Sequence, residues 1–204
     1  MEEHEMRYAI RRSEDALIIV DVQRDFCSGG ALPVPEGEKI IPTLNRYIKK
    51  FSEAGALIIA TRDWHPPNHV SFVKYGGPWP PHCVQGTPGA EFHPDLKLPR
   101  NIKIVSKATS ADKEAYSGFN GTGLGAELRK AGIRRVFVGG LATDYCVKST
   151  VLDALSLGFE TVLLLDAIKG VNVNPGDSEK AINEMLKRGA RKAVIDDFQS
   201  CHSS

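Results

Sequence analysis

Short, almost wholly apolar runs recur along the chain, and they constrain its fold more than any other feature. Each run is rich in β-branched residues, is bounded by charged residues or glycine, and shows almost no polar alternation. The runs occupy residues 16–20, 57–60, 102–105, 136–138, 161–165 and, more weakly, 193–195. Continuous apolar runs of this length are typical of strands that are covered on both faces, as in a parallel sheet.

Helical patterns lie between these runs. Apolar residues recur there at spacings of three and four, and a glycine follows each pattern as a stop signal. The patterns cover residues 40–51, 124–131, 146–155 and 181–186, and the glycines are Gly55, Gly132, Gly158 and Gly189. Alternating strands and helices predict an α/β fold with right-handed crossovers. We expect one domain over residues 1–204, a three-layer sandwich whose mostly parallel, about six-stranded sheet has helices on both faces.

One long interval, residues 62–100, breaks this alternation. It is rich in proline, holds four of the six histidines, and shows no convincing strand or helix. Loops longer than about 15 residues are uncommon in compact domains and are usually functional or disordered. Aromatic residues such as Trp64, Phe72 and Trp79 argue against disorder. Because ligands in open α/β sheets bind beyond the carboxyl ends of the strands, we expect this loop to wall such a site.

The same loop begins with groups that are suited to binding a metal ion. Asp63 and His65 stand two residues apart, so their side chains project the same way if the segment is extended. His69 and His82 follow, and a third imidazole would complete a set that leaves positions open for water or substrate. The alternative is that the histidines face solvent and that the aspartate caps a turn.

Cys146 is a candidate nucleophile. An apolar run and four small or apolar residues, 139–142, come before it. We expect a helix to begin near Thr143 or Asp144, both good N-caps, so that Cys146 lies in its first turn. The N–H groups and the helix dipole at such a start favour an anion, which predicts a lowered pKa for the thiol and a place for an oxyanion. The alternative is a buried structural cysteine, which is the usual role of cysteine in a helix.

Two further polar residues come just after predicted strands. Asp21 follows the first run, and Lys107 follows the third. The carboxyl ends of parallel strands meet at one edge of a sheet, so Asp21, Asp63, Lys107 and Cys146 should lie close together. There a carboxylate can accept the proton of a thiol, and an ammonium group favours the thiolate. Taken singly, Asp21 could only cap a turn and Lys107 could only be solvated.

Composition and spacing argue against several other classes of protein. With 26 Lys and Arg against 25 Asp and Glu, the net charge of +1 weakens any nucleic-acid interpretation. No G-x-G-x-x-G follows a strand directly, no phosphate-binding P-loop motif occurs, and the apolar runs are too short to span a membrane. The four cysteines form no C-x-x-C pair, so they indicate neither a disulfide scaffold nor a zinc ribbon. Since the N-terminus also shows no apolar leader, the reducing cytoplasm is the expected compartment.

Five successive segments resemble the motifs of the nicotinamidases (pyrazinamidases), which are isochorismatase-like cysteine hydrolases. The segments are ALIIVDVQRDFCSGGALPV, TRDWHPPNHVSF, WPPHCVQGTPGAEFHP, SKATSADKEAYSGF and VGGLATDYCVKSTVLDALSLG. The resemblance covers about residues 15–175, and its third segment distinguishes nicotinamidases from most of the superfamily. It implies an isochorismatase-like fold and the hydrolysis of nicotinamide to nicotinate and ammonia in NAD salvage, through a cysteine thioester. Pyrazinamide is implied as a further substrate.

The resemblance also implies a catalytic triad and a metal centre. The triad is expected to consist of Asp21, Lys107 and Cys146. One divalent ion, with zinc as the first choice and iron or manganese as alternatives, is expected on Asp63, His65 and His82, with His69 as a further ligand in some relatives.

A substrate pocket and an oxyanion hole are implied in the same way. The substrate ring is expected against the aromatic residues Phe26, Trp79 and Tyr116. The oxyanion hole is expected to use the N–H groups of Ala142 and Cys146, with a cis peptide bond between Leu141 and Ala142.

Other functions and the state of assembly stay open at this point. The chain could hydrolyse another small amide, whereas isochorismate is disfavoured because its vinyl ether needs acid chemistry rather than a thiol. A non-catalytic metal-binding or redox-sensing module could also use Cys146 and the histidine loop. Steady turnover of nicotinamide would distinguish an enzyme from a sensor. No interface stripe stands out, so a homo-oligomer is neither predicted nor excluded.

Overall fold

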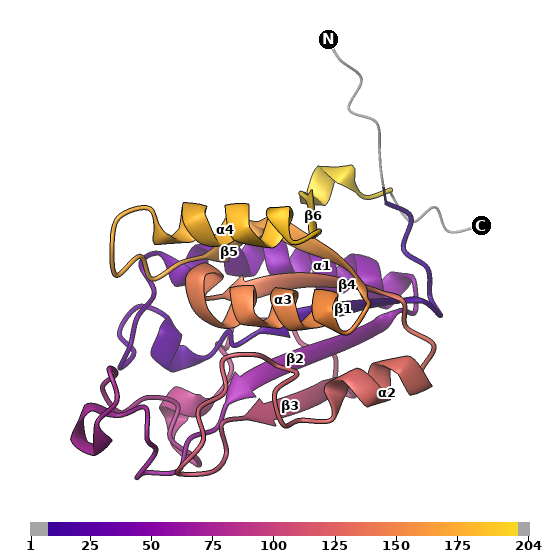
Figure 1. Cartoon of the computed structure of the whole chain (residues 1–204). Coiled ribbons are helices and arrows are strands. Elements are labelled where there is room, and N and C mark those ends of the chain that lie inside the picture. The colour runs from indigo at the N-terminus through magenta and orange to yellow at the C-terminus, as the bar shows by residue number, and fades with distance from the viewer. Residues whose placement is uncertain (1–7, 200–204) are drawn as a thin grey trace.

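A parallel sheet of six strands runs through the computed structural model, which describes residues 8–199 (Figure 1). The strands lie in the order β3-β2-β1-β4-β5-β6, and every neighbouring pair is parallel. Their bounds are β1 Asp15–Val20, β2 Leu57–Asp63, β3 Lys103–Lys107, β4 Arg135–Leu141, β5 Glu160–Lys169 and β6 Arg191–Ala193. The predicted parallel sheet of about six strands is therefore confirmed.

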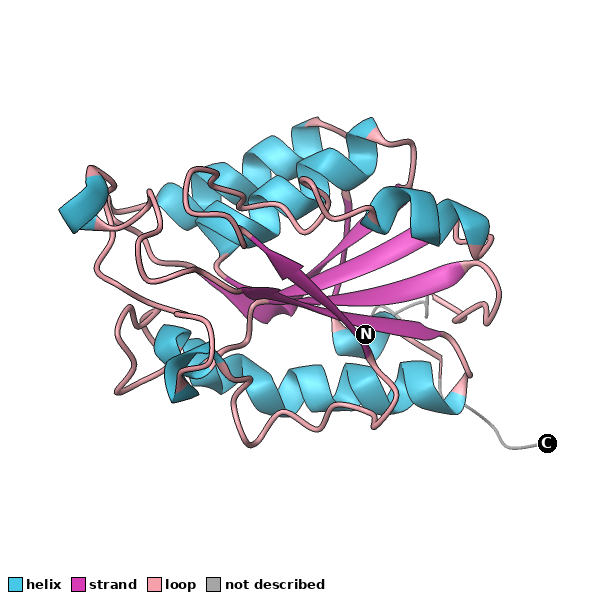
Figure 2. Ribbon diagram, turned by 90° about the horizontal axis from the view of Figure 1, so that it is seen from below, coloured by secondary structure: helices cyan, strands magenta, loops and turns pink. Residues whose placement is uncertain are grey.

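Helices cover both faces of this sheet (Figure 2). They are α1 Ile41–Glu53, α2 Leu124–Lys130, α3 Lys148–Ser156 and α4 Asp177–Lys187. One apolar cluster packs α1 against one face, and a second cluster packs residues of α2, α3 and α4 against the other. The result is the three-layer sandwich that the alternating patterns predict. No helix among residues 8–199 is long and apolar enough to cross a membrane.

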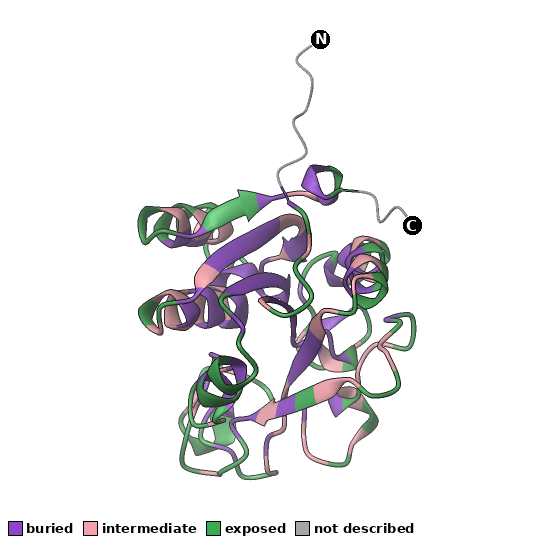
Figure 3. Ribbon diagram, turned by 90° about the vertical axis from the view of Figure 1, so that its right-hand side faces the viewer, coloured by how far each residue is buried: buried purple, intermediate pink, exposed green. Residues whose placement is uncertain are grey.

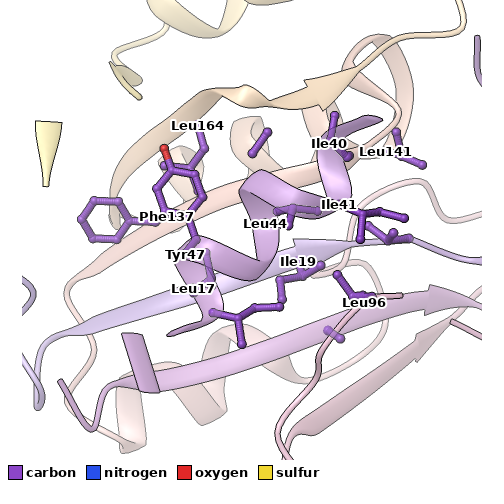
Figure 4. Close-up of a cluster of buried hydrophobic side chains, with 14 of the residues drawn as sticks. Leu17, Ile19, Ile40, Ile41, Leu44, Tyr47, Leu96, Phe137, Leu141 and Leu164 are labelled. Atoms are coloured by element: carbon purple, nitrogen blue, oxygen red, sulfur yellow. The ribbon is translucent and has the colours of Figure 1, made fainter. Parts of the chain in front are cut away.

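The two central strands show why continuous apolar runs form this sheet. Every residue of β1 and of β4 is buried, and buried residues are concentrated along the strands (Figure 3). Successive side chains of a strand point to opposite faces. Leu17 and Ile19 accordingly pack with Leu44 of α1 (Figure 4), whereas Ile18 and Val20 belong to the cluster on the other face. Both faces of β1 are thus covered by apolar side chains.

Four strands extend further toward their carboxyl ends than the apolar runs indicate. β2 continues to Asp63, β3 to Lys107, β4 to Leu141 and β5 to Lys169. The prediction placed Lys107 just after its strand, but Lys107 is the last residue of β3 and is paired in register with Asp63. Asp63 and Lys107 can end β2 and β3 because they form an ion pair with each other, and apolarity alone could not show this.

The strand order places a switch point between β1 and β4. From β1 the chain builds β2 and β3 on one side, and then returns to build β4, β5 and β6 on the other. In open α/β sheets, the carboxyl ends of the strands at such a point form a crevice that binds ligands. Asp21 follows β1 there, and the segment that leads to Cys146 follows β4.

The long loop after β2 has little regular structure, as predicted. Beyond Asp63 it contains the short 3₁₀ turns Val73–Tyr75 and Pro88–Ala90 and isolated bridges. One bridge pairs His65 with Val84, which brings the far part of the loop back beside β2. Cys201, which we expected in a polar tail without a catalytic role, lies outside the described residues.

Candidate active site

Three neighbouring strand ends bring two carboxylates and an ammonium group into contact. Lys107 Nζ lies 2.8 Å from Asp21 Oδ2 and donates a hydrogen bond to Asp63 Oδ1. It also donates to the carbonyl oxygen of Ala115 at 3.2 Å. Both side chains of the Asp21–Lys107 pair are fully buried. The expected convergence of these residues at one edge of the sheet is therefore observed.

Cys146 reaches the same group from β4. Its Sγ lies 3.4 Å from Lys107 Nζ, and its side chain is buried. It stands in a π-helical turn, Thr143–Val147, that precedes α3, and π-helical turns occur frequently at functional sites. The peptide bond between Leu141 and Ala142, just before this turn, is cis.

The expected helix start near Thr143 is confirmed, but the expected capping by Thr143 or Asp144 is wrong. The turn begins at Thr143 after Ala142, and no side chain caps it. The carboxylate of Asp144 instead accepts hydrogen bonds from the N–H groups of Val171 and Asn172, at 2.9 and 2.7 Å. This carboxylate holds the segment after β5 and does not cap its own helix.

The expectation of a lowered pKa for the Cys146 thiol is also wrong. Burial raises the pKa of Cys146 well above its ordinary value, and the carboxylates of Asp21 and Asp63 add to the effect, although Lys107 opposes it. Burial also raises the pKa of Asp21, against the attraction of Lys107. The thiol of the free protein is therefore neutral near pH 7, and it lies beside a carboxylate that is more basic than an exposed one.

Lys107 remains charged in this buried cluster. Burial alone would lower the pKa of Lys107, but the carboxylates of Asp21 and Asp63 raise it well above its ordinary value. A buried ammonium is stable only when it is paired and hydrogen-bonded, and Lys107 meets both conditions.

Asp63, His65 and His82 form a group that is suited to one cation. Their ligand atoms all lie within 4.8 Å of one another, and all three side chains are buried. Asp63 Oδ2 faces His65 Nε2 at 3.5 Å and His82 Nε2 at 4.0 Å. The Nδ1 atoms contact backbone carbonyls, of Ala108 at 3.2 Å and of Pro80 at 2.7 Å. Such contacts fix a histidine so that its Nε2 lone pair is free for a metal.

His69 lies beside this group but faces other partners. Its ring is 4.1 Å from that of His65, centroid to centroid. Its Nδ1 contacts Ser71 Oγ at 2.7 Å, and its Nε2 contacts the carbonyl oxygen of Lys113 at 2.9 Å. The structure thus groups His82, rather than His69, with both Asp63 and His65, whereas His69 lies within 4.8 Å of His65 and Glu114, ligand atom to ligand atom.

A small pocket opens beside Cys146 and the metal-binding group. Its lining includes the three aromatic residues expected against a substrate ring, and both residues expected in the oxyanion hole. The lining residues are Phe26, Leu32, Val34, Asp63, Trp79, His82, Tyr116, Ala142, Tyr145, Cys146 and Val171.

The aromatic wall of the pocket is held by its own contacts. Trp79 Nε1 donates a hydrogen bond to Tyr116 Oη at 3.0 Å, which ties the long loop to the segment after β3. Tyr145 packs edge-on against Trp79, with ring centroids 5.1 Å apart. Because the remaining lining is largely apolar, the pocket favours a flat, uncharged ring.

Gln23 is a site residue that the sequence reasoning missed. Its side chain is fully buried, and its Oε1 accepts a hydrogen bond from the N–H of Asp63 at 2.8 Å. Its Nε2 donates to the carbonyl oxygens of Asp63 at 2.8 Å and of Ala90 at 2.9 Å. Gln23 therefore fixes the backbone of Asp63. Its only signal in the sequence is its position two residues after Asp21.

The sequence reasoning also missed two other supporting residues, Thr61 and Asp25. Thr61 Oγ1 donates to Asp21 Oδ1 at 2.7 Å, and Asp25 Oδ2 accepts the N–H of Cys83 at 2.8 Å. Asp21 and Cys83 adopt left-handed backbone conformations, with φ of 48° and 46°. Non-glycine residues at such angles cost about 1 kcal/mol or more, and they persist where neighbouring contacts hold them.

Comparison with known proteins places the chain in a family. The isochorismatase domain matches residues 15–196. A nicotinamidase of Escherichia coli is 41% identical, over 90% of this chain and 96% of that protein.

Two solved structures are similar in both sequence and fold. A pyrazinamidase of Pyrococcus horikoshii in complex with zinc is 60% identical, with a TM-score of 0.86 over 89% of this chain and 99% of that one. A protein of L. infantum in complex with nicotinate is 35% identical, with a TM-score of 0.84 over 94% of this chain and 99% of that one. The chain therefore belongs to the isochorismatase family, in which it groups with the nicotinamidases.

Proposed function

We propose that the protein hydrolyses nicotinamide to nicotinate and ammonia, and that it acts on pyrazinamide in the same way. The observation that carries this proposal is the position of the Cys146 thiol. It lies 3.4 Å from the ammonium of Lys107 and lines a pocket whose other walls are largely apolar and aromatic. The similarity to nicotinamidases and to a nicotinate-bound structure supports the choice of substrate.

In the first half of the reaction, Cys146 becomes the nucleophile. The proton of Sγ passes to the carboxylate of Asp21, whose oxygen lies within 4.8 Å of the sulfur. The sulfur attacks the carboxamide carbon, and the N–H groups of Ala142 and Cys146 stabilise the resulting oxyanion. Asp21 then gives its proton to the departing nitrogen, and ammonia leaves a thioester on Cys146.

In the second half, the same groups hydrolyse the thioester. Asp21, again a carboxylate, takes a proton from a water molecule, whose oxygen attacks the thioester carbon. The intermediate collapses, and the product leaves as the acid, which loses its proton to solvent to give nicotinate. The sulfur recovers its proton from Asp21. Lys107 stays positively charged throughout and stabilises the sulfur whenever it is anionic.

We further propose that one divalent cation binds Asp63, His65 and His82. One carboxylate and two imidazoles form a donor set that suits zinc, iron or manganese, and the zinc-bound pyrazinamidase makes zinc the first choice. The arrangement of Asp63 supports this fit. Its Oδ1 accepts a hydrogen bond from Lys107, and its Oδ2 faces both histidines. When bound there, the cation supplies an electrophilic site for the ring nitrogen of the substrate, reached directly or through water.

The cytoplasm stays the compartment that we expect for this enzyme. Cys27, Cys83 and Cys146 are free thiols in the described part of the chain. A reducing environment keeps such thiols from oxidising.

An assay of ammonia release over a panel of small amides tests the proposed function. We expect steady turnover of nicotinamide and pyrazinamide, and at least about tenfold lower kcat/KM for aliphatic amides, because these leave the aromatic walls without a ring to contact. If only another amide were hydrolysed, that amide rather than nicotinamide would be the substrate. Oxidation of one thiol equivalent without any turnover would favour the redox-sensing module.

Gln23→Met is expected to weaken metal binding without replacing a ligand. The substitution leaves the N–H and carbonyl of Asp63 and the carbonyl of Ala90 without the partner that Gln23 gives them. We expect a loss of about 2 to 4 kcal/mol in unfolding free energy and of roughly 10- to 100-fold in zinc affinity. Zinc titration of the metal-free protein by calorimetry measures the second effect.

Asn45→Ala is the matched control for this substitution. The amide of Asn45 also bonds two backbone groups, of Asp95 and Lys97, but outside the pocket. Asn45→Ala should lower the free energy of unfolding and leave the zinc affinity unchanged. Equal zinc affinity in Gln23→Met and the unmodified protein would contradict the role of Gln23.

A further inference from the structure

The segment that follows β5 forms one wall of the pocket and is held from two sides. We call this segment, residues 170–172, the wall turn. Val171 lines the pocket together with Cys146, and Asn172 adopts a left-handed backbone conformation with φ of 52°. Asn172 Oδ1 accepts the N–H of Ser178, in the first turn of α4, at 2.8 Å. One side of the wall turn is thereby attached to α4.

The other side of the wall turn is attached to the π-helical turn Thr143–Val147, which holds Cys146 and which we call the nucleophile turn. Asp144 stands two residues before Cys146, and only 8% of it is exposed. Its Oδ1 accepts the N–H of Val171 at 2.9 Å, and its Oδ2 accepts the N–H of Asn172 at 2.7 Å. Hydrogen bonds from N–H groups to a carboxylate are roughly twice as strong as neutral ones, so this attachment is firm.

There is little space for the wall turn to move between its two attachments. A Cβ atom built on Gly170 would lie 1.8 Å from Ser178 Oγ and 3.0 Å from Asp144 Oδ1. The backbone at Gly170 is therefore packed directly between α4 and the nucleophile turn. The position of Val171, and with it the distance across the pocket, depends on these contacts.

We propose that Asp144 is a positioning residue that holds the Val171 wall against the nucleophile turn, and thereby restricts the pocket to single-ring amides. The proposal rests on the proposed function for its choice of substrates. Asp144 touches neither the substrate nor the reacting atoms. It acts by joining the segment that carries the nucleophile to the segment that limits the size of the substrate.

A carboxylate is the group that this role requires. It offers an acceptor oxygen to each of two neighbouring N–H groups. An asparagine would turn an NH₂ group toward one of them, so that two donors would face each other. Asp144→Asn should therefore release one end of the wall turn while it keeps the size of the side chain.

The test compares Asp144→Asn with Asp166→Asn in the metal-loaded protein. Asp166 lies on β5, and its carboxylate also accepts two hydrogen bonds, from Tyr47 Oη at 2.8 Å and the N–H of Ile195 at 2.9 Å. It does not line the pocket. It therefore controls for the general effect of weakening a carboxylate that accepts two hydrogen bonds.

For Asp144→Asn we expect KM for nicotinamide to rise about tenfold while kcat changes less than about threefold. The ratio of kcat/KM for quinoline-3-carboxamide to that for nicotinamide should rise, because the second ring gains room. Val171→Ala, which enlarges the same wall directly, should shift this ratio in the same direction. Asp166→Asn should lower the melting temperature and leave both KM and the ratio unchanged. An unchanged KM and ratio in Asp144→Asn, or the same changes in Asp166→Asn, would overturn the proposal.

Hydrogen exchange separates this inference from the proposed function. In Asp144→Asn, the amide protons of Val171 and Asn172 should exchange faster than in Asp166→Asn, whether or not any amide is hydrolysed. If the unmodified protein hydrolyses no amide, the proposed function fails, and exchange alone decides the role of Asp144. Equal exchange rates at Val171 and Asn172 in the two variants would then overturn it.

Discussion

Cys146→Ala is expected to lower the rate of ammonia release from nicotinamide by at least about 10⁴-fold, because it removes the atom that forms the thioester. Asp21 and Lys107 remain paired in this variant, so the buried charges keep their partners. The fold and the melting temperature should therefore change little. Steady-state assays, together with thermal unfolding of the same samples, measure both results.

Cys27→Ala is the matched control for Cys146→Ala. Cys27 is also a buried free thiol, and burial raises its pKa to about 11. It touches neither Lys107 nor Asp21, so this variant should keep its activity. If Cys146→Ala kept more than roughly one per cent of the activity of the unmodified protein, Cys146 would not be the nucleophile.

The convergence of the strand ends could be predicted because it depends only on topology. Once the apolar runs are interpreted as parallel strands, their carboxyl ends must meet at one edge. Asp21, Asp63 and Lys107 stand at three such ends, so their position along the chain was sufficient to predict that they meet. The direct pairing of Asp63 with Lys107 in the sheet register was not predicted, because both residues were expected just after their strands.

The electrostatic state of the thiol could not be predicted from position. A thiol at a helix start was expected to have a lowered pKa, but the pKa depends on everything that surrounds the sulfur. Burial of Cys146, together with the carboxylates of Asp21 and Asp63, raises its pKa and outweighs the effect of the single ammonium of Lys107. Sequence spacing shows none of these neighbours, since they come from three other strands.

Gln23 and Asp144 show a second limit of sequence reasoning. Each bonds to backbone groups that are distant along the chain, Gln23 to Asp63 and Asp144 to Val171 and Asn172. Backbone N–H and carbonyl groups are the same at every residue, so no pattern of side chains marks them as partners. Such supporting residues become visible only when the folded chain brings the segments together.

Removal of the metal is the second change for which we expect a large effect. Treatment with a chelator should abolish turnover of nicotinamide, and added zinc should restore it. Zinc at about 100 times its dissociation constant should stabilise the metal-free protein by about 2.7 kcal/mol, which raises the melting temperature by roughly 5 to 10 °C for a chain of this size. Thermal unfolding with and without zinc measures this shift.

His82→Ala should abolish both the activity and the shift in melting temperature. His82 supplies one of the three ligands, and its Nε2 faces Asp63 Oδ2. His93→Ala is the control, because His93 lies outside the metal-binding group, and the variant should keep both properties. Equal melting temperatures of the unmodified protein with and without zinc would count against metal binding at this group.

The charges of the cluster explain why a cation should stabilise the fold as well as serve the reaction. Lys107 is the ammonium group that the buried side chains of Asp21 and Asp63 share. It contacts Asp63 at Oδ1, whereas Asp63 Oδ2 faces the imidazoles of His65 and His82. Burial lowers the pKa of His82, which favours the neutral imidazole. A buried carboxylate oxygen is stabilised by a cationic partner. A divalent cation at Asp63 Oδ2 would supply one, so loss of the metal should weaken the fold at the place where the chemistry occurs.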